Sequence, residues 1–270
     1  DEFIILNLNS NKERFGPNIY SLDFQNSHNP ERVSKLIISI FNKFPNEKFT
    51  LIPNFGEVSH TASALANNQN SKSRILGIAH ANQDAFLNIL NQFKPIISEF
   101  IAVSNGLKQR LVNEHQISVA KIHTIYPIFI STIHIDKPNN KSAKSILSLK
   151  IVSRLTEVDK RADRIVPLVN KLRNENIPFK LDIFGDGPSK QVIERSLSMN
   201  TKNSSVVLHG EQSLKTVFKS YKDGDILISL AENEGFGIAI AEAMQCQLLP
   251  IIMKFKMGIC ELLRNGRDTF

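Results

Sequence analysis

Several residue types are scarce in this chain of 270 residues, and their scarcity argues against several classes of protein. There are two cysteines, Cys246 and Cys260, with no CxxC spacing and no clustered histidines around them. We therefore expect neither a disulfide framework nor a zinc site, and a cytoplasmic location is the simpler interpretation. No run approaches the roughly 18 apolar residues of a membrane-spanning helix. The first ten residues, DEFIILNLNS, lack the basic flank and cleavage site of a signal peptide.

Aromatic residues that could stack on bases are also scarce, although the net charge is positive. Tryptophan is absent and tyrosine occurs three times, while 33 basic residues face 26 acidic ones. The formal charge of +7 is compatible with a basic cleft for phosphates, a basic face for anionic lipid, or a surface for nucleic acid. Because the basic residues are scattered and few residues could stack, nucleic acid is the least favoured of the three partners.

Short apolar segments alternate with amphipathic segments in the second half of the chain. ILSLKIVSRL (146–155) predicts a strand, and KRADRIVPLVNKLRNEN (160–176) predicts a helix. Further strands are predicted at 179–187, 205–210, 225–231 and 248–254, and further helices at 188–200, 213–224 and 238–246. Continuously apolar strands that alternate with helices are typical of a parallel sheet covered on both faces. The pattern therefore predicts a doubly wound, Rossmann-like α/β domain.

The first half of the chain alternates in the same way, with longer loops. Strands are predicted at 2–8, 49–55, 74–80 and 99–104, and helices at 30–44 and 105–115, the second with Ser104 placed to cap it. A stretch rich in Pro, Asn, Ser and Lys separates the halves and predicts a linker. We expect an N-terminal Rossmann-like domain over 1–135, a linker over 136–146 and a C-terminal Rossmann-like domain over 147–270, facing each other across a cleft.

The stretch ENEGFGIAIAEAM (232–244) joins a predicted strand to a predicted helix in the second domain. Ligands of parallel α/β sheets bind at this edge, beyond the carboxyl ends of the strands. Gly235 and Gly237 allow the backbone to approach a ligand closely. The N–H groups of Phe236, Gly237 and Ile238 could then face a phosphate at the positive end of the helix dipole.

Two glutamates bracket this turn, Glu234 in the loop and Glu242 on the predicted helix. Carboxylates accept hydrogen bonds from hydroxyl groups, so the two residues could hold two parts of one ligand. The alternative is a tight turn before a closely packed helix, with Glu242 exposed to solvent.

Two basic residues are expected at the same edge of the sheet. Arg154 ends the first strand of the second domain, and Lys160 begins its first helix. A guanidinium binds two oxygens and an ammonium adds a point charge, a pair that suits a diphosphate. The alternative is that both are solvated surface charges. A second glycine-bearing turn, Gly185-Asp-Gly187, carries little information alone.

Three segments in this order, SRLTEVDKRAD, LDIFGDGP and EGFGIAIAEAM, resemble the retaining GT-B glycosyltransferases of the large family four, glycosyl transferases group 1. The last segment matches that family's Glu-x7-Glu signature, and EFIAVSNGLKQRL and MGICELLRNGRD show weaker similarity. The resemblance implies an enzyme of the hexosyltransferase type in class EC 2.4, active in polysaccharide biosynthesis. Its donor would be a nucleotide-diphosphate sugar, UDP- or GDP-linked, and its acceptor a glycan, a lipid-linked molecule or another hydroxyl compound.

The resemblance also implies roles for the donor-site residues. Arg154 and Lys160 are similar to the pair that neutralises the donor diphosphate, Glu242 to the acid that holds the ribose, and Glu234 to the acid that contacts the transferred sugar. The turn at Gly235, Phe236 and Gly237, followed by Ile238, would offer backbone amides. Fixed cations stabilise the departing diphosphate, so the family's reaction requires no metal.

His80, in GIAHANQDAF, is similar to the first-domain histidine that reaches the transferring sugar. Together with Glu234 it is the catalytic candidate that the resemblance implies. The alternative for His80 is a surface histidine or one with its hydrogen bonds satisfied inside the fold.

The sequence departs from the family pattern in its spacing and at its ends, and it also contains one motif typical of metal-dependent glycosyltransferases. The interval from Arg154 to Lys160 is one residue longer than usual, so Lys160 and Arg161 could exchange roles. Asp223-Gly224-Asp225 has the spacing of a manganese site, but it precedes a strand, and we interpret it as a turn with Gly224 as a left-handed helix cap. Both ends also lack segments that the family has, so a fragment is expected.

Two other functions stay open at this point. One is a catalytically silent, nucleotide-sugar-binding subunit of GT-B fold, and the other is a nonhydrolysing sugar-nucleotide epimerase, which shares the two-domain architecture. The basic surplus also supports a hypothesis of peripheral contact with the inner face of an anionic membrane.

Overall fold

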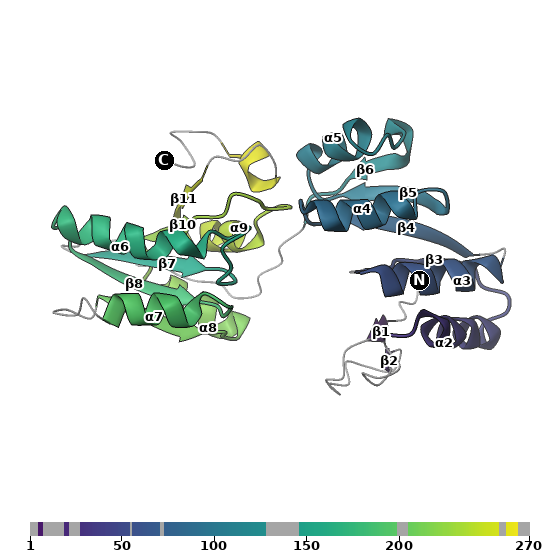
Figure 1. The fold of residues 1–270 in the computed structure, drawn as a ribbon, viewed down its shortest axis with the longest axis horizontal. Helices are drawn as coiled ribbons and strands as arrows, with labels where there is room; N and C mark the ends of the chain where they lie inside the picture. The colour runs from purple at the N-terminus through teal and green to yellow at the C-terminus, as the bar shows by residue number, and fades with distance from the viewer. Residues whose placement is uncertain are drawn as a thin grey trace. The chain divides into compact units, whose positions relative to one another are not determined.

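The computed structural model describes residues 5–7, 19–21, 28–54, 56–70, 73–127, 146–198, 205–253 and 258–263. The chain divides into two compact units. The first comprises Asp1–Val103 with Leu107–Ile125, and the second comprises Ser104–Gly106 with Tyr126–Phe270. Each unit has its own parallel sheet, as Figure 1 shows.

The first unit contains a four-stranded parallel sheet in the order β3-β4-β5-β6. Its strands are β3 (Phe49–Leu51), β4 (Ser73–Ala79), β5 (Ile97–Ala102) and β6 (Ile122–Thr124). Its helices are α2 (Pro30–Lys43), α3 (Glu57–Asn68), α4 (Asp84–Gln92) and α5 (Asn105–Asn113), with the short 3-10 helix η1 (Val119–Lys121). β1 (Ile5–Asn7) and β2 (Ile19–Ser21) form a separate parallel pair.

The helix α2 shows how local sequence sets these elements. The Asn29 side chain accepts the N–H groups of Glu31 and Arg32, and Pro30 occupies the first turn, where its missing N–H is not needed. The apolar residues recur on one face, which is buried. The buried apolar residues of this face are Val33, Ile37, Ile40 and Phe41.

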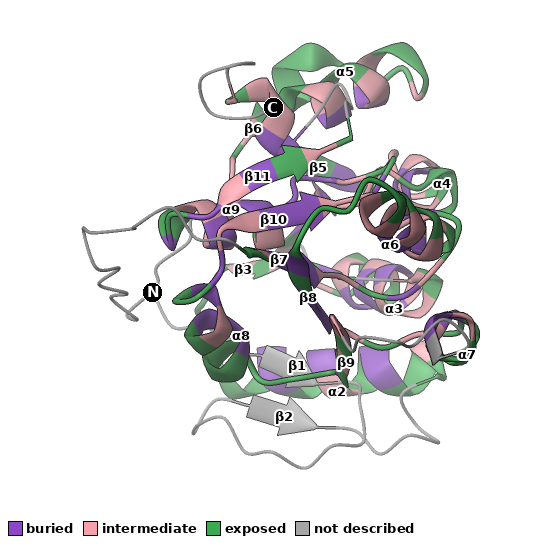
Figure 2. Ribbon diagram, turned by 90° about the vertical axis from the view of Figure 1, so that its left-hand side faces the viewer, coloured by how far each residue is buried: buried purple, intermediate pink, exposed green. Residues whose placement is uncertain are grey.

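The second unit contains a five-stranded parallel sheet in the order β11-β10-β7-β8-β9. Its strands are β7 (Leu147–Val152), β8 (Phe179–Phe184), β9 (Val206–Gly210), β10 (Ile226–Ser229) and β11 (Leu249–Ile252). Its helices are α6 (Ile165–Asn174), α7 (Lys190–Ser198), α8 (Leu214–Tyr221) and α9 (Ile238–Gln245), with the 3-10 helices η2 (Ala162–Arg164) and η3 (Gly258–Glu261). Figure 2 shows β8 almost wholly buried, whereas α7 has both buried and exposed residues.

The two faces of this second sheet differ in polarity. One face is apolar, where Leu149 and Ile151 of β7 pack with residues of α6 and α7. Lys150 lies between them in sequence and therefore points to the opposite face. There it forms a buried ion pair with Asp182 of β8, with Nζ and Oδ2 2.6 Å apart. Nε2 of His209 on β9 lies 2.8 Å from the other Asp182 oxygen.

The predicted fold class is confirmed: the chain contains two parallel α/β sheets of Rossmann type. Each strand and helix predicted in the second half overlaps an observed one, although the first predicted helix begins only at Ile165, after η2. The helices α3 and α4 and the strand β6 were not predicted individually. Residues 136–145 of the predicted linker (136–146) lie outside the described residues, and the predicted domain boundaries stay a prediction. No helix in the described ranges is long and apolar enough to cross a bilayer.

The prediction of a left-handed cap at Gly224 is wrong. The residue does not have a positive φ. Instead, a Cβ atom at Gly224 would lie 2.8 Å from a side-chain carbon of Leu248 and 3.2 Å from Cε of Lys150. Glycine therefore leaves room here for the side chains of Leu248 and Lys150, next to the buried ion pair.

Removing one partner of this ion pair is expected to destabilise the second unit strongly. Asp182→Ala leaves the Lys150 ammonium buried without its counterion, which costs about 3–5 kcal/mol. Asp163→Ala is the control, because it removes a carboxylate from a more exposed pair with Arg161 and is expected to cost about 1 kcal/mol or less. Urea unfolding followed by circular dichroism measures both, and equal losses in the two variants would contradict the expectation.

The same pair predicts a dependence of stability on pH. Burial alone would raise the pKa of the Asp182 carboxyl, but hydrogen bonds from Lys150 and His209 outweigh burial and hold the pKa below its usual value. The stabilisation is therefore present above the unfolded pKa of about 3.9 and is lost as the pH falls through the lower folded pKa. We expect the free energy of unfolding to fall in this acidic window, and to fall less in the paired variant Lys150→Met/Asp182→Leu.

Candidate functional site

A pocket lies at the carboxyl ends of β7 and β10, next to the first residues of α9. Its lining includes Ser153 after β7, Leu230 after β10, and Gly237 with Ile240 at the start of α9. Parallel α/β sheets bind their ligands at this edge, where helix N-termini and strand ends meet. Two charged side chains, Lys160 and Glu234, also line it. We take this pocket as the candidate site.

Lys160 and Glu234 form an ion pair in the pocket. The ammonium nitrogen lies 2.6 Å from Glu234 Oε1, and the two side chains are only 14% and 19% exposed. A charge-assisted hydrogen bond in such partial burial is stronger than one between neutral groups in water. The structure thus brings together two of the predicted site residues.

Arg161 does not take the place of Lys160. Its backbone is left-handed, with φ of 51°, and its side chain hydrogen-bonds the carboxylates of Asp163 and Glu232 rather than lining the pocket. Glu232 also pairs with Arg164. A left-handed turn at a residue other than glycine is uncommon and carries local strain. Lys160 therefore lines the pocket and Arg161 does not, whereas the predicted role of either residue toward a diphosphate stays a prediction.

The buried carboxylate of Asp159 organises the loop that carries these cations. It accepts hydrogen bonds from Arg154 at 2.8 Å, from the Thr156 hydroxyl at 2.5 Å and from the Lys160 N–H at 3.1 Å. Its carbonyl oxygen accepts the N–H of Glu232, which joins this loop to the one before α9. Burial acts to raise the pKa of Asp159, but the Thr156 hydroxyl and the two cations outweigh it and lower the pKa. Asp159 therefore stays ionised.

Arg154 lies beside the pocket and is not part of its lining. Its side chain is 65% exposed and is held through one guanidinium nitrogen by Asp159. The remaining nitrogens are available to solvent or to an anion at the mouth of the site. The structure thus ties the guanidinium to Asp159 through one terminal nitrogen and leaves most of the side chain exposed.

The turn at Gly185 and Gly187 packs against the loop that carries Arg154. A Cβ atom at Gly185 would lie 1.9 Å from the carbonyl oxygen of Ser153, and one at Gly187 would lie 2.6 Å from that of Leu155. The N–H of Leu155 donates to the Asp186 carbonyl at 2.8 Å. Backbone packed this closely leaves no room for a side chain, so the turn positions the loop that carries Arg154.

The glycine turn before α9 is also held by close backbone contacts, in this case with η3. Gly237 is left-handed, with φ of 95°, and its carbonyl accepts the first N–H groups of the helix, from Ile240 and Ala241. The Phe236 ring is buried, and the Phe236 carbonyl accepts the N–H of Ile259 at 2.6 Å. A Cβ atom at Gly258 would lie 2.5 Å from that same carbonyl oxygen. The segment η3 therefore braces the glycine turn.

Gly235 and Ile238 complete the predicted turn. Gly235 lies next to Glu234 in the loop, and Ile238, the first residue of α9, is 51% exposed. Neither residue lines the pocket, whereas Gly237 does. The predicted contact of the backbone amides with a ligand stays a prediction.

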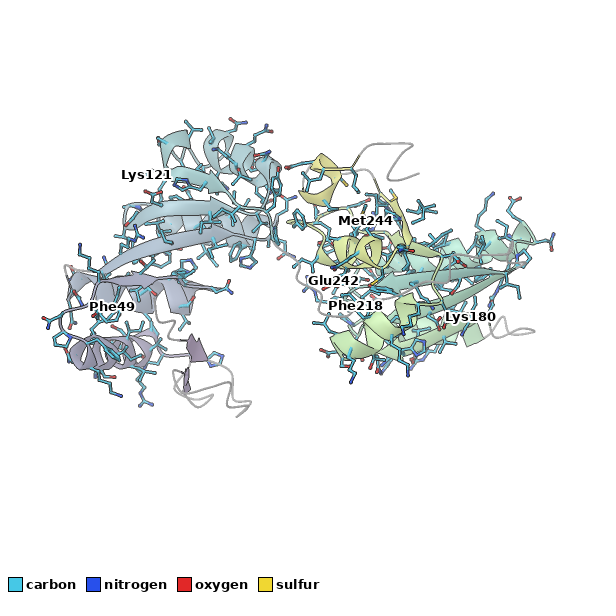
Figure 3. All side chains as sticks on the ribbon, turned by 180° about the vertical axis from the view of Figure 1, so that it is seen from behind. Phe49, Lys121, Lys180, Phe218, Glu242 and Met244 are labelled. Atoms are coloured by element: carbon cyan, nitrogen blue, oxygen red, sulfur yellow. The ribbon has the colours of Figure 1, made fainter. Side chains whose placement is uncertain are left out.

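Glu242 lies on α9, outside the pocket lining. It is partly buried, and burial raises the pKa of its carboxyl. Its backbone carbonyl accepts the N–H of Cys246 at 3.2 Å. Figure 3 labels Glu242 among the side chains of the second unit. The second glutamate of the signature thus lies on the helix that begins at the site, and its predicted contact with a ribose stays a prediction.

His80 follows β4 in the first unit. It is half-buried, with its ring centroid 4.5 Å from that of Phe86. Its pKa is lowered chiefly by burial, against a hydrogen bond to the Ile78 backbone that acts in the opposite direction. The ring is therefore held in its neutral form. Its predicted action on the transferring sugar stays a prediction, because Glu234 belongs to the other unit.

Asp223-Gly224-Asp225 lies at the opposite edge of the second sheet. The Asp225 carboxylate accepts the N–H of Ser148 at 3.0 Å, and the Asp225 N–H donates to the Ser148 carbonyl at 2.8 Å. These bonds tie the start of β10 to β7, as a turn before a strand requires. Within the ranges that the structure describes, no three His, Cys, Asp or Glu side chains are grouped as metal ligands would be.

Comparison with known proteins places the chain in a family. Residues 132–270, more than half of the chain, match the family described as glycosyl transferases group 1. The chain belongs to this family, and the resemblance drawn from the sequence motifs is confirmed.

The relatives include several that are named as N-acetylglucosaminyltransferases. One relative is the UDP-N-acetylglucosamine–peptide N-acetylglucosaminyltransferase GtfA subunit of Streptococcus agalactiae, to which the chain is 26% identical over 175 residues. The aligned region covers 64% of this chain and 34% of that protein. The chain thus spans about a third of the length of this relative.

Solved structures of GT-B type share the fold. A mutant of the S. aureus protein TarM, in complex with fondaparinux, alpha-GlcNAc-glycerol and UDP, aligns with a TM-score of 0.70 at 19% identity, over 88% of this chain and 48% of that chain. The pneumococcal O-GlcNAc transferase GtfA, in complex with UDP and GlcNAc, aligns with a TM-score of 0.61 at 14% identity, over 86% and 47%. The predicted GT-B fold class is therefore confirmed.

The close packing of Gly185 against the Ser153 backbone can be tested by mutation. Gly185→Ala places a methyl group against the Ser153 carbonyl and is expected to cost about 3 kcal/mol or more of unfolding free energy, because backbone must move. Gly210→Ala is the control in the same unit: its φ is 69°, but its nearest neighbour is the flexible end of Lys190 at 3.2 Å. It is expected to cost about 1 kcal/mol. Denaturant unfolding compares them, and similar stabilities would contradict the assigned packing.

Proposed function

We propose that this chain carries the donor-binding site of a retaining glycosyltransferase, which moves a sugar from a nucleotide-diphosphate sugar to a hydroxyl acceptor. The observation that carries the proposal is the Lys160–Glu234 pair in a pocket at the carboxyl edge of a parallel sheet, beside the start of α9. The pocket lies within the segment that matches the glycosyl transferases group 1 family. UDP is the favoured nucleotide, because it is the one bound in the structural relatives TarM and GtfA.

In this proposal each site residue binds a different part of the nucleotide-sugar donor. Arg154 and Lys160 neutralise the diphosphate, and the N–H groups at the start of α9 add the positive end of the helix dipole. When the diphosphate takes Lys160 as its partner, Glu234 is released from the ion pair and accepts hydrogen bonds from the sugar hydroxyls. Glu242 holds the ribose. As the sugar–phosphate bond breaks, the fixed cations stabilise the charge that develops on the leaving diphosphate.

The neutral His80 contributes from the first domain as a group that contacts the transferring sugar. The acceptor is a glycan, a lipid-linked molecule or another hydroxyl compound. The net charge of +7 supports peripheral contact with an anionic membrane surface.

A donor-binding subunit without its own turnover is the second candidate. The relative from Streptococcus agalactiae is named as a subunit, and this chain spans about a third of its length. Donor binding with neither sugar transfer nor donor hydrolysis would favour this candidate over the enzyme.

Donor binding tests the first proposal directly. Lys160→Met is expected to weaken UDP binding about 10- to 100-fold, because a hydrogen bond to a charged group contributes about 1.5–3 kcal/mol. Lys171→Met on α6 is the matched control, since this lysine is 74% exposed and pairs only with Glu175, and it should leave the affinity unchanged. Isothermal titration calorimetry gives both values. A wild-type chain that binds none of UDP, GDP and ADP, or their sugars, would remove the proposal.

The proposal also predicts binding of UDP without a divalent metal. The cations at the site are side chains, and the Asp225 carboxylate is engaged by the Ser148 N–H. We therefore expect the dissociation constant for UDP to be the same in EDTA and in millimolar manganese. A manganese-dependent gain in affinity that Asp225→Asn abolishes would show that the turn before β10 is a metal site.

A further inference from the structure

Arg110 of α5 holds the loop that follows β4 in the first unit. Its Nη1 donates to the backbone carbonyl and to the side-chain oxygen of Asn82, both at 2.7 Å. Its Nη2 donates to the Asp84 carboxylate at 2.6 Å and to the Glu114 carboxylate at 2.5 Å. The Arg110 side chain is only 19% exposed, so these charge-assisted bonds are partly shielded from water. One guanidinium therefore joins α5 to the loop and to the first residue of α4.

This loop carries His80, the catalytic candidate of the first unit. Residues 80–83 lie between β4 and α4, outside helices and strands. They follow the carboxyl end of a parallel strand, which is the edge where such sheets bind ligands. Gln83, the N-cap residue of α4, makes no side-chain capping bond in the described chain. Contacts from other segments therefore matter for the position of this loop, and Arg110 supplies several of them.

Contacts on both sides of the loop link Arg110 to the His80 ring. On one side, Asn82 follows His80 closely in the sequence. On the other side, Phe86 lies in the first turn of α4 with Asp84, and its ring centroid is 4.5 Å from that of His80. A planar guanidinium that binds the loop and the helix start in one geometry limits the movement of both. The position of the imidazole thus depends on Arg110.

The bonds of Arg110 exceed what the stability of α5 requires. An ion pair with Glu114, one turn along the same helix, would stabilise α5 and needs only one cation. A lysine could make that pair, but its single nitrogen has too few donors for all the oxygens that Arg110 binds. The additional donors of the guanidinium go to Asn82 and Asp84, which lie outside α5. This use of the side chain indicates a role in the loop.

We propose that Arg110 is a positioning residue for His80: its bonds to Asn82 and Asp84 fix the loop so that the imidazole is held where it contacts the transferring sugar. The inference rests on the proposed function, because it takes His80 as a group that acts on the sugar of the donor. Arg110 itself does not touch the substrate. Its loss therefore lowers the turnover of bound donor and leaves the binding of a nucleoside diphosphate, which is assigned to the second unit, unchanged.

Arg110→Gln tests the inference, with Arg74→Gln in the same unit as the matched control. Arg74 is exposed and donates to the Thr50 hydroxyl at 3.0 Å, so its loss removes a similar group from another part of the sheet. The substrate is the nucleotide sugar that the wild type binds, from UDP-, GDP- and ADP-sugars, with water as the acceptor. We expect Arg110→Gln to lower the rate constant of hydrolysis about 10-fold or more, because a misplaced catalytic group costs this much. The dissociation constant of the nucleoside diphosphate should stay the same, and Arg74→Gln should change neither value.

Proton NMR tests the link to His80 without turnover. The ring current of Phe86 shifts the imidazole resonances of His80, since the two rings are in contact. Arg110→Gln should move these resonances and Arg74→Gln should not, with His80→Gln used to assign them. Asn82→Ala removes one acceptor and keeps Arg110, so it should move them by less. It also takes the place of Arg110→Gln in both experiments if that variant does not fold.

A double-mutant cycle separates positioning from a general effect on the first unit. Arg110→Gln should add little to the loss of hydrolysis caused by His80→Gln, because both changes remove the same contribution. Additive losses would assign Arg110 a role in packing alone and would overturn the inference.

Each other failure has a different meaning. If the wild type binds no nucleotide sugar, or binds one and hydrolyses none, the proposed catalysis fails and this inference fails with it. If the wild type hydrolyses its donor and Arg110→Gln does so equally fast, only the inference is overturned. Unchanged His80 resonances in Arg110→Gln, or weaker binding of the nucleoside diphosphate, would also overturn the inference alone.

Discussion

The geometry of the site depends on the buried carboxylate of Asp159. Its oxygens hold the Arg154 guanidinium, the Thr156 hydroxyl and the Lys160 N–H, while its backbone carbonyl holds the N–H of Glu232. A buried charge is tolerated only when it is paired and hydrogen-bonded, so the loop cannot leave this arrangement without stranding the carboxylate. One side chain therefore fixes two cations at the sheet edge and also joins the loops that precede α6 and α9.

Adjacent cations on this loop are directed to different acids. The left-handed backbone at Arg161 turns its side chain away, toward Glu232 and Asp163, while Lys160 lines the pocket with Glu234. Two cations in one small pocket would repel each other in the absence of an anion. The divergence leaves one cation inside the pocket and uses the other to tie down the loop before α9. The interval from Arg154 to Lys160 is one residue longer than is usual in the family, and this arrangement still leaves Lys160 in the pocket.

The sequence was informative about elements with strong periodicity and less so about elements built from small residues. The strands and helices of the second unit follow from apolar runs that alternate with amphipathic segments. The helix α3, in contrast, buries Ala62 and Ala66, so its apolar face is too weak to stand out, and β6 has only three residues. In the site, the motif predicted Lys160 and Glu234, but the choice against Arg161 depended on a left-handed turn, and the roles of Asp159 and Gly258 depended on contacts between segments far apart in sequence.

The two faces of the second sheet contribute differently to the stability and to the geometry of the second unit. The face toward α6 and α7 is apolar, and its burial supplies stability without fixing a unique geometry. The opposite face carries the Lys150–Asp182 pair, and Gly224, just after α8, packs against Lys150. Polar groups in a low-dielectric interior interact strongly only in a few arrangements, so they restrict how α8 and its neighbours can lie.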